Sequence, residues 1–197
     1  MHLEFCYPAK PAGSHKGSGS HVSESTEAAV RQLRETTVVN HLEAENQHDI
    51  AATLATFKSG VARTELPGEV AVGHDAVADS YRELFIAFPD MRFDIDPGSL
   101  CHHDHQVMTE THVRGTHLGP YRGLPPTGRA VKLPLALIFE FDGAELVCER
   151  AYFDRMDLLI QLGVGRDPNS TAGQIATLLN HPVTVARAAL RARRLRN

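Results

Sequence analysis

The stretch from Gln106 to Asp154 constrains the fold most, because three runs within it alternate between apolar and polar residues. The runs cover residues 107–114, 132–141 and 147–154, and turn residues separate them. In an extended strand, alternate residues lie on the same face, so each run has one apolar face and one mixed face. We therefore predict an antiparallel sheet with one apolar side, which helices must cover, and a pocket between sheet and helices.

One carboxylate interrupts the apolar side of this predicted sheet. The apolar faces are expected to carry Val107, Thr109, Thr111 and Val113 in the first run, Leu133, Leu135, Leu137, Phe139 and Phe141 in the second, and Val147, Glu149, Ala151 and Phe153 in the third. A buried, unpaired carboxyl group has a raised pKa and suits general acid or base catalysis. Glu149 is therefore a candidate catalytic residue. The alternative is a strand irregularity or a partner such as Arg150.

Helical patterns precede the sheet and supply further candidates. His41 and Glu45 are four residues apart on the predicted first helix, and His48 follows three residues later, so the three share one face. A carboxylate beside an imidazole orients it and raises its basicity, so His41 and Glu45 are predicted to be catalytic. The alternative is a solvated helix face. Tyr81 lies on the apolar stripe of a later helix and either offers its hydroxyl to the pocket or belongs to the core.

Composition excludes several classes of function. The chain has 197 residues, a hydrophobic fraction of 42% and a net charge of −4, which suit one ordinary globular domain and argue against general nucleic-acid binding. No apolar run is long enough to span a bilayer, and the first residues lack a secretory apolar segment, so we expect a cytoplasmic protein. The three cysteines are widely spaced, so they indicate neither a disulfide framework nor a zinc site.

The two ends of the chain differ from its middle. Residues 1–22 are rich in Gly, Ser, Pro and His and are predicted to be a flexible lead, and residues 23–164 form the expected domain. Residues 165–197 are read as a linker and a basic C-terminal helix. That helix could contact an anionic membrane surface or nucleic acid. We favour the alternative, in which Val183, Val185, Ala189 and Leu190 pack on the domain and leave the arginines solvated.

Four segments together resemble the SnoaL-like polyketide cyclase, or ester cyclase, family of the nuclear transport factor 2-like superfamily. They are HLEAENQHDIAATLATF, LFIAFPDMRF, RGTHLGPYRGLPPTGRAV and ERAYFDRMDLLIQLG, and the resemblance covers about residues 38–163. It implies an α+β cone, in which about three N-terminal helices cover a curved antiparallel sheet. It also implies an internal pocket, a homodimer formed through the outer face of the sheet, and ring closure by aldol chemistry without metal or organic cofactor.

The resemblance also excludes one activity. Limonene-type epoxide hydrolases carry an Arg-x-Asp pair and a second Asp at positions that correspond here to Thr111, Val113 and Ala151. None of these residues can activate water or protonate an epoxide oxygen. Ala151 also removes the position at which the resemblance places a cyclase carboxylate.

Two further candidates have structural alternatives. Asp154 either acts as an acid or base at the pocket mouth or caps the helix that follows it; we favour the cap. His117 contacts a ligand if a bulge at Gly115 turns it inward. The cluster of His102, His103, Asp104 and His105 is not expected to bind metal, because adjacent residues in an extended turn diverge.

We therefore expect a cofactor-free enzyme that uses acid/base catalysis on a small hydrophobic carbonyl or ester compound. The alternative is a non-catalytic binding or dimerisation module with the same pocket. The predicted catalytic residues are Glu149, Asp154, His41 and Glu45, and the predicted ligand contacts are Tyr81, Thr109, Thr111, His117, Leu135, Leu137, Ala151 and Phe153.

Overall fold

The computed structural model describes residues 24–195, so the predicted lead at 1–22 lies outside the described residues. The helices are α1 (Glu24–Asn46), α2 (Ile50–Ala55), α3 (His74–Ala87), α4 (Arg155–Gln161), α5 (Thr171–Asn180) and α6 (Pro182–Arg194), with a short 3-10 turn, η1 (Pro97–Ser99). The strands are β1 (Arg63–Leu66), β2 (Glu69–Val72), β3 (Arg92–Phe93), β4 (Cys101–His103), β5 (Gln106–Thr116), β6 (Ala130–Asp142) and β7 (Glu145–Phe153).

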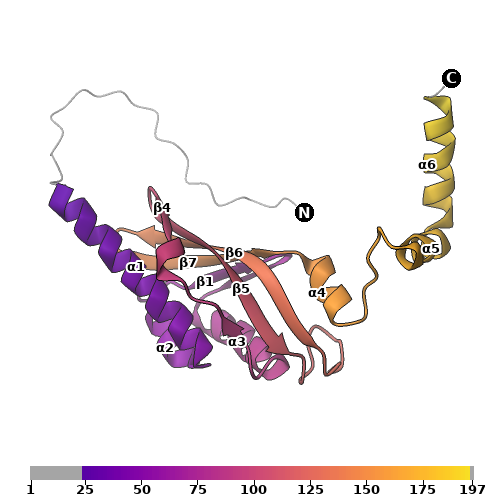
Figure 1. Cartoon of the computed structure of the whole chain (residues 1–197). Helices are drawn as coiled ribbons and strands as arrows, with labels where there is room; N and C mark the ends of the chain where they lie inside the picture. The colour runs from indigo at the N-terminus through magenta and orange to yellow at the C-terminus, as the bar shows by residue number, and fades with distance from the viewer. Residues whose placement is uncertain (1–23, 196–197) are drawn as a thin grey trace.

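The strands form one curled sheet with the order β2-β1-β7-β6-β5-β3, and β4 also pairs with β5. The three long strands β5, β6 and β7 are antiparallel neighbours, and α1, α2 and α3 cover one side of the sheet (Figure 1). This confirms the predicted α+β class and the cone-like arrangement. One detail differs from the prediction, because β1 pairs with β7 in parallel. The sheet is therefore mixed at that edge.

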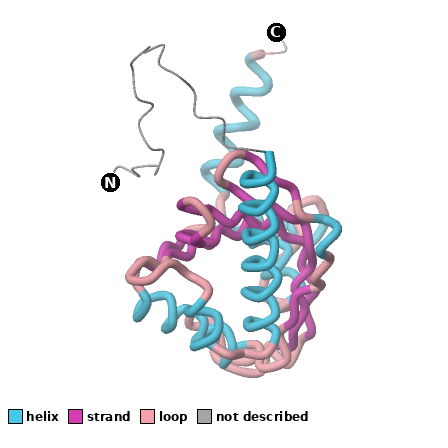
Figure 2. The backbone as a smooth tube through the Cα atoms, turned by 90° about the vertical axis from the view of Figure 1, so that its left-hand side faces the viewer, coloured by secondary structure: helices cyan, strands magenta, loops and turns pink. Residues whose placement is uncertain are grey.

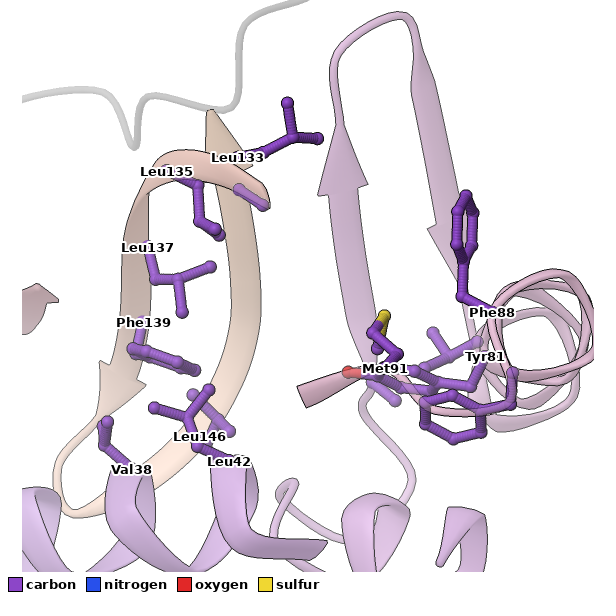
Figure 3. Packing of buried hydrophobic residues seen from close by; sticks show 14 of the residues in the cluster. Val38, Leu42, Tyr81, Phe88, Met91, Leu133, Leu135, Leu137, Phe139 and Leu146 are labelled. Carbon is purple, nitrogen blue, oxygen red and sulfur yellow. The ribbon is translucent and has the colours of Figure 1, made fainter. Parts of the chain in front are cut away.

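The core lies between the concave side of the sheet and the helices. The side chains of Leu133, Leu135, Leu137 and Phe139 follow one another along the same face of β6, as their alternation predicts (Figure 3). Val38 and Leu42 approach this row from α1, and Leu137 and Phe139 are fully buried. Burying each such side chain contributes about 1.5–3 kcal/mol, so this row anchors the helices to the sheet.

A bulge in β7 changes which residues face the core. Phe139 pairs with Glu149 and Glu140 with Cys148, but Phe141 pairs with Leu146, so Val147 is left as an extra residue. Leu146 is fully buried whereas Val147 is only partly buried, so the prediction that Val147 faces the core is wrong. Beyond the bulge the alternation resumes in the predicted phase, and it keeps Glu149 and Ala151 on the inner face.

The last two helices do not pack on the domain. In Figure 1, α5 and α6 stand beyond the end of the sheet, and Figure 2 shows α6 projecting from the rest of the fold. Val183 and Leu190 are more than half exposed, so the prediction that they pack on the domain is wrong. Among residues 24–195, no helix combines the length and the apolar character needed to cross a membrane.

Candidate functional site

A pocket of about 100 Å³ opens between the concave face of the sheet and helices α1 and α3. Apolar side chains from β5, β6, β7 and α3 make up most of its walls, including Leu135, Leu137 and Ala151. Glu45, Tyr81 and Glu149 also line it, and all three are buried. A mostly apolar pocket with a few converging polar groups is the usual form of a small-molecule site.

Three separate elements bring the polar groups together. His41 and Glu45 are one helical turn apart on α1, Tyr81 belongs to the buried stripe of α3, and Glu149 faces inward from β7. His41 is 0% exposed and Glu45 is 1% exposed. The imidazole ring of His41 also meets the rings of Phe57 and Phe139 edge-on, which fixes its position behind the pocket wall.

Hydrogen bonds connect these groups into one cluster. The Tyr81 hydroxyl donates to Oε2 of Glu149 over 2.6 Å, and its oxygen lies 3.2 Å from Nε2 of His41. The same Nε2 lies 3.4 Å from Oε1 of Glu45 and 3.5 Å from Oε2 of Glu149. The single hydroxyl hydrogen of Tyr81 is used toward Glu149, so Nε2 of His41 is the donor to the Tyr81 oxygen.

The other nitrogen of His41 is held by α2. Its Nδ1 lies 2.6 Å from Oγ1 of Thr56, and the Thr56 hydroxyl donates to the carbonyl oxygen of Thr53. Thr56 can therefore only accept at the imidazole, and Nδ1 carries a hydrogen. Since both ring nitrogens donate, the hydrogen-bond pattern assigns His41 as a positively charged imidazolium next to two carboxylates.

Electrostatics favours the same protonation state. Burial lowers the pKa of His41, but hydrogen bonds to Glu149 and Glu45 and the charges of both groups outweigh it and raise the pKa from 6.5 to about 10. Burial and the charge of Glu149 raise the pKa of Glu45, against the opposing effect of His41. Burial and the two carboxylates raise the pKa of Tyr81 well above 10, so it remains a neutral hydroxyl.

One acceptor in the cluster has no partner. Oε2 of Glu45 is buried and makes no hydrogen bond, and Glu45 is the only pocket-lining residue with such an atom within residues 24–195. Leaving a buried carboxylate oxygen unpaired is unfavourable by about 1–3 kcal/mol or more. A ligand that offers a hydrogen at this point would recover that energy.

The cluster also has the donor types of a metal site. Ligand atoms of His41, Glu45 and Glu149 all lie within 4.8 Å of one another, so the three could hold a divalent cation if His41 lost its Nε2 hydrogen. The present contacts instead direct that hydrogen toward Tyr81 and the carboxylates. The imidazolium thus supplies the positive charge between the two carboxylates, and we treat the cluster as a proton-transfer site.

The structure brings together most of the residues predicted for the pocket. Glu45, Tyr81, Leu135, Leu137, Glu149, Ala151 and Phe153 all line it, and His41 lies directly behind Glu45 and Glu149. Asp154 is placed elsewhere: its exposed carboxylate accepts hydrogen bonds from the backbone of Met156 and Asp157 and caps α4. These contacts correspond to the capping alternative rather than to a catalytic role.

Three other predicted ligand contacts do not line the pocket. The hydroxyl of Thr109 pairs with that of Ser99, and the hydroxyl of Thr111 donates to the carbonyl oxygen of Asp94. Both hydroxyl groups are therefore hydrogen-bonded to residues that precede β5. His117 is fully buried beneath the loop after β5, where its Nδ1 accepts from the backbone of Thr127 and its ring packs against Phe88. Burial lowers the pKa of His117, which suits this structural position.

Near the cluster, the sequence patterns gave one wrong prediction, for His48, and missed one residue, Thr56. His48 follows the end of α1 with a positive φ of 56°, and its Nε2 lies 3.0 Å from the carbonyl oxygen of Met91, so it does not join His41 and Glu45. Thr56 was not predicted, because the α1–α2 turn that brings it to His41 leaves no periodic signal. Threonine at the end of a helix is too common for its position alone to indicate a functional role.

Comparisons with known proteins agree with this architecture. A protein-family model described as SnoaL-like polyketide cyclase matches residues 35–162. A search of curated proteins finds no match. Many solved structures are similar, and the three described next are all below 25% identity, so they support the fold alone.

A SnoaL-like polyketide cyclase structure from Jannaschia sp. CCS1 has 17% identity and a TM-score of 0.61, and the match covers 68% of this chain and 94% of that one. A structure described as a polyketide cyclase from Xanthomonas campestris has 22% identity, a TM-score of 0.60, and coverage of 68% and 98%. A phenazine biosynthesis-related protein from Pseudomonas aeruginosa has 18% identity, a TM-score of 0.61, and coverage of 81% and 94%.

Proposed function

The chain belongs to the SnoaL-like polyketide cyclase family, and from this premise we propose that it is a cofactor-independent cyclase or isomerase. It acts by acid/base catalysis on a small, hydrophobic carbonyl compound. The observation that carries the proposal is the buried cluster of Glu45, Tyr81, Glu149 and His41 at a mostly apolar pocket. Fold alone would not support an activity, because one fold hosts many functions.

Glu45 is the proposed base. Its Oε2 has no hydrogen-bond partner and its pKa is raised, so it offers an unused acceptor for a ligand hydrogen and is more basic than an ordinary carboxylate. Glu149, by contrast, already accepts the Tyr81 hydrogen. Glu149 therefore orients Tyr81 and, with Glu45, keeps His41 charged.

The proposed step is proton abstraction next to a carbonyl group. Glu45 removes a proton from the α-carbon, and the Tyr81 hydroxyl turns from Glu149 to donate to the resulting enolate oxygen, while Nε2 of His41 continues to donate to the Tyr81 oxygen. In a cyclisation, the enolate carbon bonds to a second carbonyl carbon of the same molecule. The proton held by Glu45 then passes to the new alkoxide, so the protein returns to its starting state without a redox partner.

The walls of the pocket favour a neutral ligand. Among the residues that the structure describes, Arg114 is the one guanidinium in the lining, and it is already paired with Asp94 at the exposed end. A ligand carboxylate near the buried end would face Glu45 and Glu149 without a free cation. Charge repulsion there would weaken its binding.

Exchange of α-hydrogens for deuterium tests the proposal without knowledge of the natural substrate. A panel of small cyclic and aromatic ketones is incubated with the protein in D₂O, and the loss of α-proton signals is followed by NMR. We expect exchange above the buffer rate for at least one ketone that binds. Glu45→Gln should abolish it, because the amide cannot accept the proton.

A matched control lies on the same helix. Glu43 is exposed and its carboxylate accepts from the Gln47 side chain, so Glu43→Gln should leave exchange unchanged. Ketone binding with no exchange in the unmodified protein would overturn the enzymatic proposal. The alternative, a binding module with the same pocket, would then account for the fold and the apolar walls.

A further inference from the structure

The helices α5 and α6, together with Leu195, form a projection that we call the C-terminal arm (residues 171–195). It exposes several apolar side chains: Ile175, Leu178, Leu179, Val183 and Leu190 are all at least half exposed. The arm stands beyond the end of the sheet in Figure 1. Exposed apolar side chains that cluster on one element indicate an interaction surface.

One face of α6 combines apolar and basic residues. Val183, Arg187, Leu190, Arg191 and Arg194 follow the spacing i, i+4, i+7, i+8 and i+11, so they share a side of the helix. All five are exposed. This face therefore fits a surface that is itself partly apolar and negatively charged.

The remainder of the chain supplies the opposite charge. Residues 165–197 contain six Arg and one Asp, a net charge of +5, whereas the whole chain has a net charge of −4. Residues 1–164 therefore carry −9. Because the arm of each copy leaves its apolar side chains exposed and does not pack on its own body, such opposite charges favour its association with the body of another copy.

A groove of about 550 Å³ on the body has matching chemistry. We call it the acidic groove; it runs between the β1–β2 hairpin and α3, and its walls include Leu66, Glu69, Val70, Asp79 and Glu83. Among the described residues, Arg122 is the one basic residue in its lining and contacts Glu69 and Glu83, and Asp79 also pairs with Arg82 on the same helix. Val70 is 56% exposed on the edge strand β2, so the groove offers both apolar surface and an excess of carboxylates.

We propose that the C-terminal arm of one copy docks into the acidic groove of a second copy. Arg187, Arg191 and Arg194 then face Glu69, Asp79 and Glu83, while Val183 and Leu190 cover Val70 and Leu66. The helix α6 is about 20 Å long at 1.5 Å per residue.

This docking would also affect the pocket. Thr64, Leu66 and Ser80 line both the acidic groove and the catalytic pocket. An arm in the groove therefore covers one wall of the pocket of the other copy. The docking proposal stands on exposure and charge, and it does not depend on the proposed chemistry.

Photo-crosslinking of isotope-mixed full-length protein tests the docking. A photo-reactive residue replaces Ala186, which is exposed beside Val183 on α6, and unlabelled chain is mixed with ¹⁵N-labelled chain. Mass spectrometry then identifies each crosslinked peptide pair. We expect pairs of mixed isotope content that join the arm to peptides containing Val70 or Asp79. Crosslinks only within one copy, or to another surface, would overturn the proposal.

A charge exchange supplies the control. The arm variant carries Arg187→Glu, Arg191→Glu and Arg194→Glu, and the groove variant carries Glu69→Lys, Asp79→Lys and Glu83→Lys. Each alone should lose the mixed crosslinks several-fold. A mixture of the two variants should regain them, because each arm then meets a groove of opposite charge. Crosslinks that persist in the single variants, or fail to return in the mixture, would contradict the proposal.

Discussion

Thr56 fixes the hydrogen on one nitrogen of His41. The hydroxyl of Thr56 donates to the carbonyl oxygen of Thr53, so at 2.6 Å from Nδ1 it can only accept. This local contact turns Nε2 of His41 toward Tyr81 and the two carboxylates, where its hydrogen completes the cluster. A side chain outside the pocket lining therefore helps to set the protonation state of the site.

Replacing Thr56 with valine removes this acceptor while keeping the shape of the side chain. A buried Nδ1 hydrogen without a partner costs about 1–3 kcal/mol, so we expect a fall of that size in the free energy of unfolding, measured with urea. The pKa of His41 should also fall, because the imidazolium loses one hydrogen bond. Thr56→Ser keeps the hydroxyl and should restore both values. Equal pKa values in the valine variant and the unmodified protein would argue against a hydrogen bond from Nδ1 of His41 to Thr56.

Replacing Glu45 with glutamine should separate stability from activity. The pKa of Glu45 is raised in the folded protein, so its ionised form at neutral pH is less favourable there than in the unfolded chain. A neutral amide removes this disadvantage. We expect Glu45→Gln to unfold at an equal or higher urea concentration at pH 7 while deuterium exchange is lost, a common relation at active sites. Marked destabilisation would show that the charge of Glu45 supports the fold.

The pKa of His41 predicts how stability depends on pH. Because the folded pKa of about 10 lies above the unfolded value of 6.5, the folded protein holds a proton that the unfolded chain releases between these pH values. The stabilisation is complete below pH 6.5 and is lost as pH rises through about 10. The slope for one proton is at most about 1.4 kcal/mol per pH unit. Urea unfolding across this window measures it.

The variant Glu149→Gln provides the comparison for that pH series. It removes a carboxylate that raises the pKa of His41, so the loss of stability should still begin near pH 6.5 but should level off at a lower pH and be smaller in total than in the unmodified protein. A stability that stays constant from pH 6.5 to 10 would contradict a charged His41. An identical pH dependence in both proteins would instead mean that another group titrates in this window.

Asp154 tests the difference between a cap and a catalyst. Its carboxylate accepts from two backbone N–H groups at the start of α4, and losing such a cap costs about 0.5–2 kcal/mol. We expect Asp154→Ala to lower the free energy of unfolding by this amount. Its deuterium exchange rate per folded molecule should be unchanged. Asp154→Asn retains an acceptor and should be nearly neutral in both assays. A loss of deuterium exchange in the folded alanine variant would show that Asp154 takes part in catalysis.

Simple periodicity predicted the parts of the site that depend on one element. The four-residue spacing of His41 and Glu45 placed them on one helix face, and strand alternation placed Glu149 and Ala151 on the inner face. These inferences depend only on helix and strand geometry. The apolar row on β6 was predictable for the same reason.

Features that depend on contacts between elements were not predictable in this way. The bulge at Val147 shifts one residue in β7 without a distinctive sequence. His48 lies just beyond the end of α1 with a positive φ, although the pattern placed it on that helix. The approach of Thr56 to His41 depends on how α2 folds back against α1. The exposed position of α6 likewise could not be predicted, because periodicity does not show whether the rest of the fold offers a surface for the apolar residues of a helix.

The charge of His41 can be measured by ¹⁵N NMR titration of the unmodified protein. We expect both ring nitrogens to show imidazolium shifts at pH 7 and to titrate near pH 10. A His41 that is neutral at pH 7, with a pKa at or below the ordinary value of about 6.5, would contradict it. The cluster would then lack the positive charge between its two buried carboxylates.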